Sequence, residues 1–253
     1  MTEPADSSDR LFVTALARGL DVLAVFSAGE RSLGNAELAR RTGLPKATVS
    51  RLTYTLCKLG YLYQDASGKY APAPAVLTLG FAALAGLDLR ERAREPMRSL
   101  AAQTGLSVTL GVRQGARVVY VETCRAPTRV GIRLEVGSSV PLATTAIGRA
   151  LYVALSLTER SELAGLLAQE SPVMWPVWQQ GLDQALSDFA TLRYCASFGE
   201  FEPDIFAVAV PIAGSQPAMA INCSGPAYRL RAEQWQAEIV PCLQALAASL
   251  AAC

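Results

Sequence analysis

The segment from residue 34 to residue 60 constrains the fold most, because glycine and proline divide it into two short helices and a tight turn. The first helix is expected over residues 35–42, where apolar positions recur at helical spacing. Gly43 follows it and can adopt the positive φ that a residue with a Cβ resists. Pro45 fits the first turn of the second helix, expected over residues 45–59, because its missing N–H would be unbonded there.

The flanking sequence completes a small domain. Apolar residues at helical spacing predict a helix over residues 11–27, before the other two. After them, the alternating run 61–64 and the run 69–71 flank a turn that contains Gly68, which predicts a β-hairpin. Three helices followed by a hairpin indicate a winged helix-turn-helix domain, expected over residues 10–74.

The net charge of +1 conceals an uneven distribution. From Arg10 to Ala71, nine basic residues stand against four acidic ones, a balance of +5, whereas residues 72–253 carry a balance of −1. The third helix carries cations, hydroxyls and one small residue on its other face, which suits a DNA major groove. The predicted DNA contacts are Lys46, Ala47, Thr48, Ser50, Arg51, Tyr54 and, on the hairpin, Lys69. One alternative is that this is an ordinary solvated helix face. Another is that the domain is a winged-helix adaptor that binds protein rather than DNA.

The chain contains no histidine, which excludes the Ser-His-Asp and Cys-His nucleophile pairs and the HExxH metalloprotease motif. Six cysteines are scattered without a CxxC pair, so neither a metal site nor a disulfide framework is expected. Cys195 and Ser224 have no base close in sequence. We therefore expect no catalytic residues, no metal, no cofactor and no enzyme. An enzyme with an appended winged domain is the less favoured alternative.

The first ten residues are acidic and lack the pattern of a signal peptide. The longest nearly uncharged stretch near them, residues 71–87, contains two prolines and is too short to span a membrane. These features predict a cytoplasmic protein with no membrane partner.

Residues 75–89 predict a linker helix that is apolar on nearly every side. Such a helix must be covered, and one small winged domain cannot cover it. We therefore expect it to pack against its symmetry mate and the N-terminal helices in a homodimer. Burial within the second domain of the same chain is the alternative.

The remainder alternates helices and strands, which predicts a sheet with helices on its faces. The expected strands cover residues 108–112, 117–123, 131–136, 205–212 and 218–223. The expected helices cover residues 89–104, 146–155, 161–169 (capped by Thr158), 182–192 and 229–252.

Three motifs resemble the IclR family of bacterial transcriptional regulators. The run AELARRTGLPKATVSRLTYTLCKLGYL is similar to the family's N-terminal domain, and VGSSVPLATTAIGRALYVAL and INCSGPAYRL are similar to its effector-domain motifs, in the same order. The resemblance covers nearly the whole chain from about residue 10. It implies an α/β (α+β) protein in which a GAF-like effector-binding and oligomerisation domain with a central antiparallel sheet, residues 90–253, follows the winged domain. It also implies dimers or dimers of dimers.

The resemblance further implies a ligand-responsive regulator whose affinity for a double-stranded DNA operator changes when an effector binds over the sheet. The pair Glu202-Pro203 resembles members that regulate aromatic-acid breakdown, which implies an aromatic or otherwise larger organic acid. The matching ligand positions are Ala146, Ile147, Glu202, Ala207, Asn222 and Ser224, and simple packing is the alternative for each.

Overall fold

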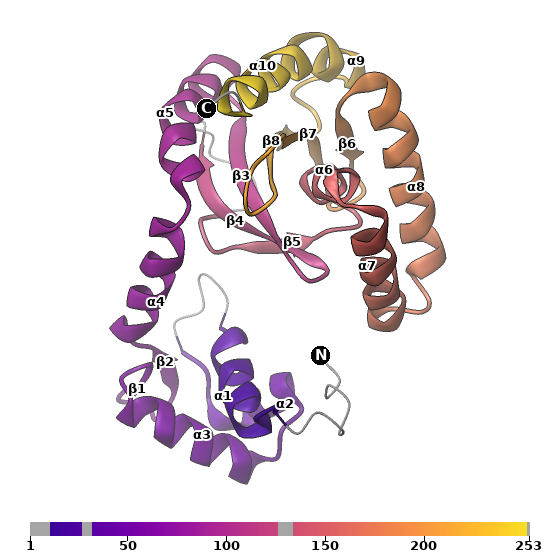
Figure 1. The fold of residues 1–253 in the computed structure, drawn as a ribbon. Coiled ribbons are helices and arrows are strands. Elements are labelled where there is room, and N and C mark those ends of the chain that lie inside the picture. Colours follow the sequence, from indigo (N-terminus) through magenta and orange to yellow (C-terminus); the bar gives the residue numbers. More distant parts are fainter. Residues whose placement is uncertain (1–10, 27–31, 126–133, 252–253) are drawn as a thin grey trace. The chain divides into compact units, whose positions relative to one another are not determined.

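The computed structural model describes residues 11–26, 32–125 and 134–251 (Figure 1). The chain divides into two compact units, Met1–Gly86 and Leu87–Cys253. The first contains helices and a two-stranded hairpin, and the second contains a six-stranded sheet with its own helices.

The first unit is a winged helix-turn-helix, as predicted. Its elements are α1 (Thr14–Ala24), α2 (Asn35–Thr42), α3 (Lys46–Lys58), β1 (Leu62–Gln64), β2 (Tyr70–Pro72) and α4 (Pro74–Ala85). Gly43 has a φ of 69°, which confirms the expected turn between α2 and α3. The hairpin strands pair antiparallel, with Tyr63 opposite Ala71. The buried apolar side chains of this unit include Val22, Leu38, Val49, Leu56 and Leu62.

Helix α4 ends earlier than the linker helix expected over residues 75–89. Gly86 closes it by donating its N–H to the Leu84 carbonyl, and a separate helix, α5 (Asp88–Thr104), begins two residues later. Glycine ends the helix readily because it costs about 1 kcal/mol more than alanine in a helix interior. No residue of α4 is buried.

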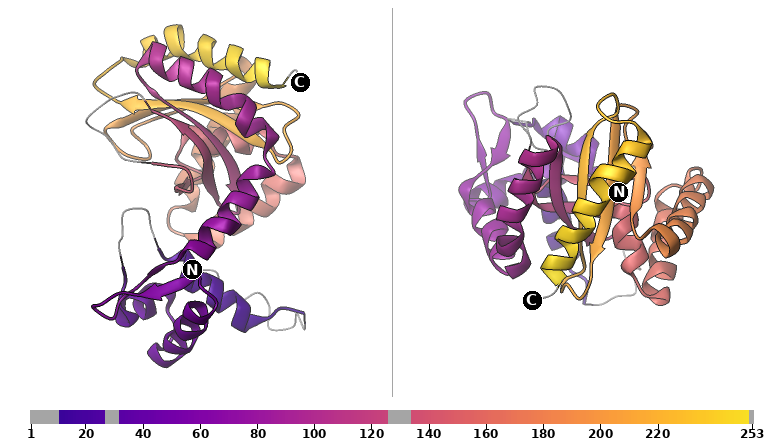
Figure 2. Two further views of the ribbon diagram at one scale, coloured as in Figure 1. Left: turned by 90° about the vertical axis from the view of Figure 1, so that its left-hand side faces the viewer. Right: turned by 90° about the horizontal axis from the view of Figure 1, so that it is seen from above.

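The second unit is an α+β domain on one antiparallel sheet, in the order β5-β4-β3-β8-β7-β6. Helices α5 and α10 (Val240–Ala251) lie across one face (Figure 2), and α6 (Ala146–Ala154) packs on the other. Helices α7 (Leu157–Glu170) and α8 (Trp175–Leu192) follow α6, and α9 (Ala232–Gln234) and a π-helical turn, Trp235–Ile239, precede α10. The strands are β3 (Ser107–Gln114), β4 (Arg117–Cys124), β5 (Ser139–Pro141), β6 (Cys195–Phe198), β7 (Ile205–Ile212) and β8 (Met219–Pro226).

The strand expected over residues 131–136 is not found where the structure can test it. Residues 131–133 lie outside the described ranges, and residues 134–136 form no strand. Gly137, with a φ of 87°, makes a turn there. The strand next to β4, at one edge of the sheet, is β5, which follows that turn.

Three helices of the second unit begin more than one residue away from their predicted start. The helix expected over residues 229–252 begins at Ala232, with α9, and continues through the π-helical turn into α10. Ser156 rather than Thr158 caps α7, because the Ser156 hydroxyl accepts from the Glu159 N–H while the Glu159 carboxylate accepts from the Ser156 N–H. Helix α8 begins at Trp175, seven residues before its predicted start at residue 182. Strand β6 has only four residues and was not predicted.

Candidate DNA-binding face and effector site

Helix α3 turns one side to the core and the other to solvent. Val49, Thr53 and Leu56 are buried, and α3 packs on both α1 and α2. Of its predicted DNA contacts, Thr48 is half-buried and the others are exposed: Lys46, Ala47, Ser50, Arg51 and Tyr54. The structure therefore places these residues on one accessible surface, as a major-groove helix requires.

The hydroxyl of Ser50 differs from the other polar groups of this surface because it already has partners. It donates to the Lys46 carbonyl at 3.0 Å and accepts from Nδ2 of Asn35 at 2.9 Å. Asn35 is the first residue of α2. No pattern in the sequence predicts this contact, since 15 residues separate the two side chains.

Two of the basic residues of the first unit are paired within α2. The Glu37 carboxylate accepts from Nε of Arg40 at 2.8 Å and from Nε of Arg41 at 2.6 Å. The hydrogen bond from Arg40, followed by that from Arg41, lowers the pKa of Glu37 to about 2. Both arginines contribute to the basic balance of this unit, but Glu37 partly neutralises their charge.

The hairpin turn is organised by Asp65. Its Oδ1 accepts from the Ser67 hydroxyl at 2.7 Å and from the backbone N–H of Lys69 at 3.0 Å. Hydrogen bonds from Ser67, Ser32 and Lys69 lower the pKa of Asp65 to about 2. The Lys69 side chain is exposed at the end of this ordered turn.

In the second unit, pairing of the strands brings polar residues from β3, β4 and β8 into one row. Thr109 lies opposite both Thr123 and Asn222, and Asn222 lies opposite Ala209. Opposite residues of antiparallel strands share a face. Ala209 belongs to the apolar cluster around α6, so the row faces α6 rather than α5 and α10.

Two side-chain atoms in this row are buried and unpaired. Asn222 Oδ1 and Thr123 Oγ1 have no hydrogen-bond partner in the part of the chain that the structure describes. An unpaired buried polar group costs roughly 1–3 kcal/mol, so native proteins rarely retain one without a reason.

Four more predicted ligand residues lie near this row. Ala207 pairs directly with Ser224, which places both on the α6 side of the sheet. Ala146, at the start of α6, belongs to the same cluster as Ala207. Ile147 packs tightly, because a Cβ built on Gly111 would lie 2.8 Å from its Cδ1. The fold thus places four of the predicted residues on the α6 side of the sheet: Asn222, Ser224, Ala207 and Ala146. The Ile147 side chain instead packs against β3 and holds α6 on the sheet.

The sixth predicted residue, Glu202, is exposed on the loop between β6 and β7 and does not belong to this cluster. The neighbouring Glu200 instead pairs with Arg149 of α6, whose Nη1 lies 2.7 Å from Oε1 of Glu200. Arg149 also donates to the carbonyls of Ala143 and Ala196, at 3.1 and 2.9 Å. This buried arginine ties α6 to β6, a contact that the sequence did not reveal.

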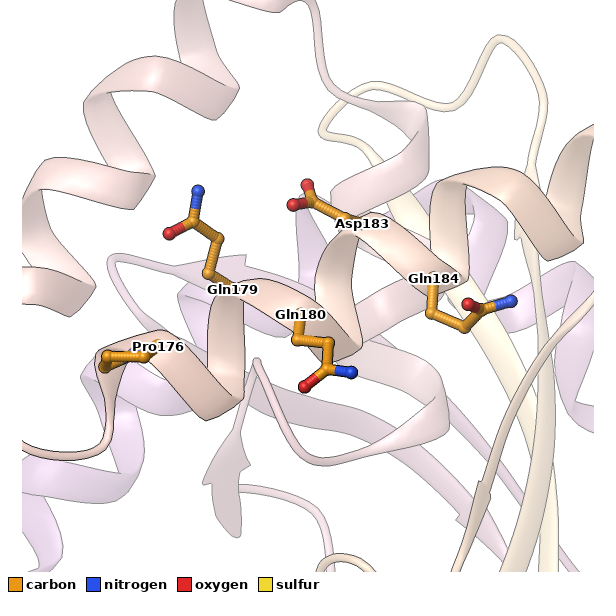
Figure 3. A pocket seen from close by; sticks show the side chains of 5 residues that line it. All are labelled: Pro176, Gln179, Gln180, Asp183 and Gln184. Atoms are coloured by element: carbon orange, nitrogen blue, oxygen red, sulfur yellow. The ribbon is translucent and has the colours of Figure 1, made fainter.

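Two hollows border α8. One, of about 310 Å³, lies between α8 and β6 beside Arg149 and Glu200. The other follows an exposed side of α8, with Pro176, Gln179, Gln180, Asp183 and Gln184 along it (Figure 3). Neither is lined by any of the six predicted effector residues.

The cysteines of the sheet are poorly suited to act as nucleophiles. Burial raises the pKa of Cys195 and of Cys223 to about 12, so both remain protonated at neutral pH. Within the described ranges, no group of three potential metal-ligating side chains comes together, and no helix is long and apolar enough to cross a membrane.

Both units match models of known domains. Residues 15–66 match the IclR helix-turn-helix domain, and residues 81–252 match the C-terminal domain of the bacterial transcriptional regulator IclR. A related protein, the HTH-type transcriptional regulator TsaQ1/TsaQ2 of Comamonas testosteroni, is 35% identical over 92% of this chain and 85% of its own length.

Solved structures share the architecture. An IclR family transcriptional regulator from Brucella abortus is 40% identical, with a TM-score of 0.86 over 98% of this chain and 95% of the other. An IclR homologue from Microbacterium hydrocarbonoxydans, solved in complex with 4-hydroxybenzoate, is 21% identical and shares the fold with a TM-score of 0.72 over 94% and 97% of the two chains. From its winged helix-turn-helix to its antiparallel sheet, the chain belongs to the IclR family of ligand-responsive, DNA-binding transcriptional regulators.

Proposed function

We propose that this protein is a cytoplasmic homodimer, without catalytic activity, whose two α3 helices contact the half-sites of an operator. Its effector is a hydroxylated, aromatic organic acid bound between α6 and the sheet. The domain limits that we propose are residues 10–74 for DNA binding, 75–89 for the link and 90–253 for effector binding and assembly.

The exposed face of α3 supports the DNA-binding part. Lys46 and Arg51 supply charge for phosphates and for guanine edges, and Thr48 and Tyr54 supply hydroxyl groups. Lys69, on the hairpin turn, supplies a further phosphate contact. Arg40 and Arg41 contribute less because Glu37 pairs with them.

Exposed apolar side chains on α1 and α4 support the homodimer. Leu20 on α1 is 55% exposed, and Leu77 and Phe81 on α4 are 64% and 68% exposed. Large apolar side chains left exposed on two helices indicate an interaction site. A second copy is the partner that we propose, because two-fold pairing of the winged domains would present two α3 helices to a palindromic operator.

The unpaired Oδ1 of Asn222 is the observation that carries the effector part. A buried carbonyl oxygen calls for a hydrogen-bond donor, and the Thr123 hydroxyl beside Thr109 can bind a donor or an acceptor. A hydroxyl on the effector supplies both. The small side chains of Ala207 and Ala146 belong to the apolar cluster on the same side of the sheet as Asn222. 4-Hydroxybenzoate, which is bound in a solved homologue of the same fold, is the natural probe.

Isothermal titration of the full chain with 4-hydroxybenzoate and with benzoate tests this site. Wild-type protein should bind 4-hydroxybenzoate more tightly, by roughly threefold to tenfold, because one net hydrogen bond is worth about 0.5–1.5 kcal/mol. Asn222→Leu should abolish the difference. Cys223→Ala, at the next position of β8 and on the opposite face, is the matched control and should preserve it. Equal binding of both acids to the wild-type protein would refute a hydroxyl-specific site.

A further inference from the structure

Asn35 joins the two helices of the DNA-binding motif through one side chain. Its Nδ2 donates to Ser50 Oγ at 2.9 Å and lies 3.3 Å from the Lys46 carbonyl oxygen. Ser50 Oγ donates in turn to that same carbonyl at 3.0 Å. The Asn35 amide, the Ser50 hydroxyl and the Lys46 carbonyl are thus all hydrogen-bonded to one another, and they connect the first residue of α2 to the start of α3.

The acceptor fixes which way the Asn35 amide points. A carbonyl oxygen such as that of Lys46 can only accept hydrogen bonds, so the amide nitrogen and not the amide oxygen must face it. Asn35 Oδ1 is then directed inward, where it is buried and has no partner among the described residues. The side chain is therefore held by its contacts with α3.

The same contacts occupy the Ser50 hydroxyl. Its single proton is used by the Lys46 carbonyl, and one lone pair is used by Asn35. Ser50 consequently has no proton left to donate to a base edge, although its side chain is exposed. The N-terminal turn of a recognition helix is the part that contacts base edges, and this turn of α3 begins at Lys46.

We propose that Asn35 is a positioning residue for DNA recognition: through Ser50 it holds the first turn of α3 against α2, and Ser50 acts through Asn35 rather than by contacting a base. This inference rests on the proposed reading of DNA by α3. It replaces the expectation that Ser50 is itself a DNA contact.

The test uses duplexes that the wild-type full chain selects from a random-sequence pool, with scrambled duplexes of equal length and matched salt. Asn35→Ala and Ser50→Ala should each weaken binding to the selected duplex roughly threefold to tenfold, the range of one net hydrogen bond, and leave the scrambled duplex unaffected. The double variant should bind no worse than the weaker single variant, because each substitution alone already removes the Asn35–Ser50 hydrogen bond. Ser50→Thr, which keeps the hydroxyl, should bind like the wild type.

Thr55→Ala is the matched control. The Thr55 hydroxyl donates to the Arg51 carbonyl at 3.0 Å, the same bond along α3 that Ser50 makes, and the structure shows no bond from α2 to it. This variant should bind the selected duplex normally. Melting curves identical to wild type confirm that each variant folds.

Three results would overturn the proposal: additive losses in the double variant, equal losses on scrambled DNA, or a base preference that Ser50→Ala loses and Asn35→Ala keeps. The Arg51→Ala variant shows whether such a result contradicts only the positioning role of Asn35 or also the proposed binding of DNA by α3. If Arg51→Ala leaves selected-duplex binding intact, α3 does not read DNA. If Arg51→Ala weakens binding and Asn35→Ala does not, only the positioning role is wrong.

Discussion

Replacing Gly148 by alanine tests how closely α6 packs against the segment before it, beside the proposed effector site. A Cβ at this position would lie 2.1 Å from the Leu142 carbonyl oxygen and 2.5 Å from the Leu142 Cα, whereas ordinary contacts are 3.4–4 Å. Those atoms belong to the backbone just before α6, and Thr145 anchors that backbone by donating to the Pro141 carbonyl at 2.6 Å. Gly148→Ala must therefore push α6 or this segment away by about an ångström.

Two opposing effects determine how much Gly148→Ala changes the free energy of unfolding. Alanine gains about 1 kcal/mol over glycine from helix propensity. Overpacking a well-packed core costs about 1–3 kcal/mol, and a backbone neighbour places the cost at the upper end or above it. We expect Gly148→Ala to destabilise the second unit by about 2 kcal/mol or more and to weaken 4-hydroxybenzoate binding.

Gly165 of α7 is the matched control, because a Cβ there would meet nothing within 4 Å. Gly165→Ala should therefore stabilise the unit by about 1 kcal/mol, the opposite sign. Urea unfolding followed by tryptophan fluorescence measures both, since Trp175, Trp178 and Trp235 all lie in the second unit. If Gly148→Ala is as stable as wild type or more so, the close approach of α6 to Leu142 is wrong.

Two further predictions concern the first unit. Arg51→Ala should weaken binding to a selected duplex about tenfold or more while leaving the thermal melting curve unchanged, and fluorescence anisotropy at matched salt checks this; unchanged affinity would contradict the assignment of the α3 face. Glu37 should remain ionised down to about pH 2, whereas an unperturbed glutamate titrates near pH 4.5. Because its folded pKa is lowered, its stabilising effect is complete above pH 4.5 and is lost as the pH falls toward 2. The carbon-13 shift of its carboxyl group reports this directly, and a midpoint near 4.5 would show that the pairing with Arg40 and Arg41 does not form in solution.

Local sequence signals predicted the DNA-binding unit closely. Gly43 tolerates the positive φ of the turn and Pro45 has a fixed φ, so the turn between α2 and α3 follows from residue type alone. In the second unit, β7 was predicted at its observed limits because its apolar run is long. Strand β6 was missed because four residues carry too little pattern, and its place in the sheet depends on pairing with β7. Ser156 was missed as a cap, although Glu159 three residues later was the available signal.

The sequence by itself determined the succession of helices and strands, the basic character of the first unit and the family motifs, because these depend on residues close together in the chain. Only the tertiary structure decided which polar groups meet. Asn222 and Thr123 stand in one row because β3 lies between their strands. Arg149 pairs with Glu200 because α6 packs beside β6. Such contacts join residues dozens of positions apart, and no periodicity along the chain records them. The same holds for Asn35 and Ser50, whose contact changes the role proposed for an exposed serine on α3.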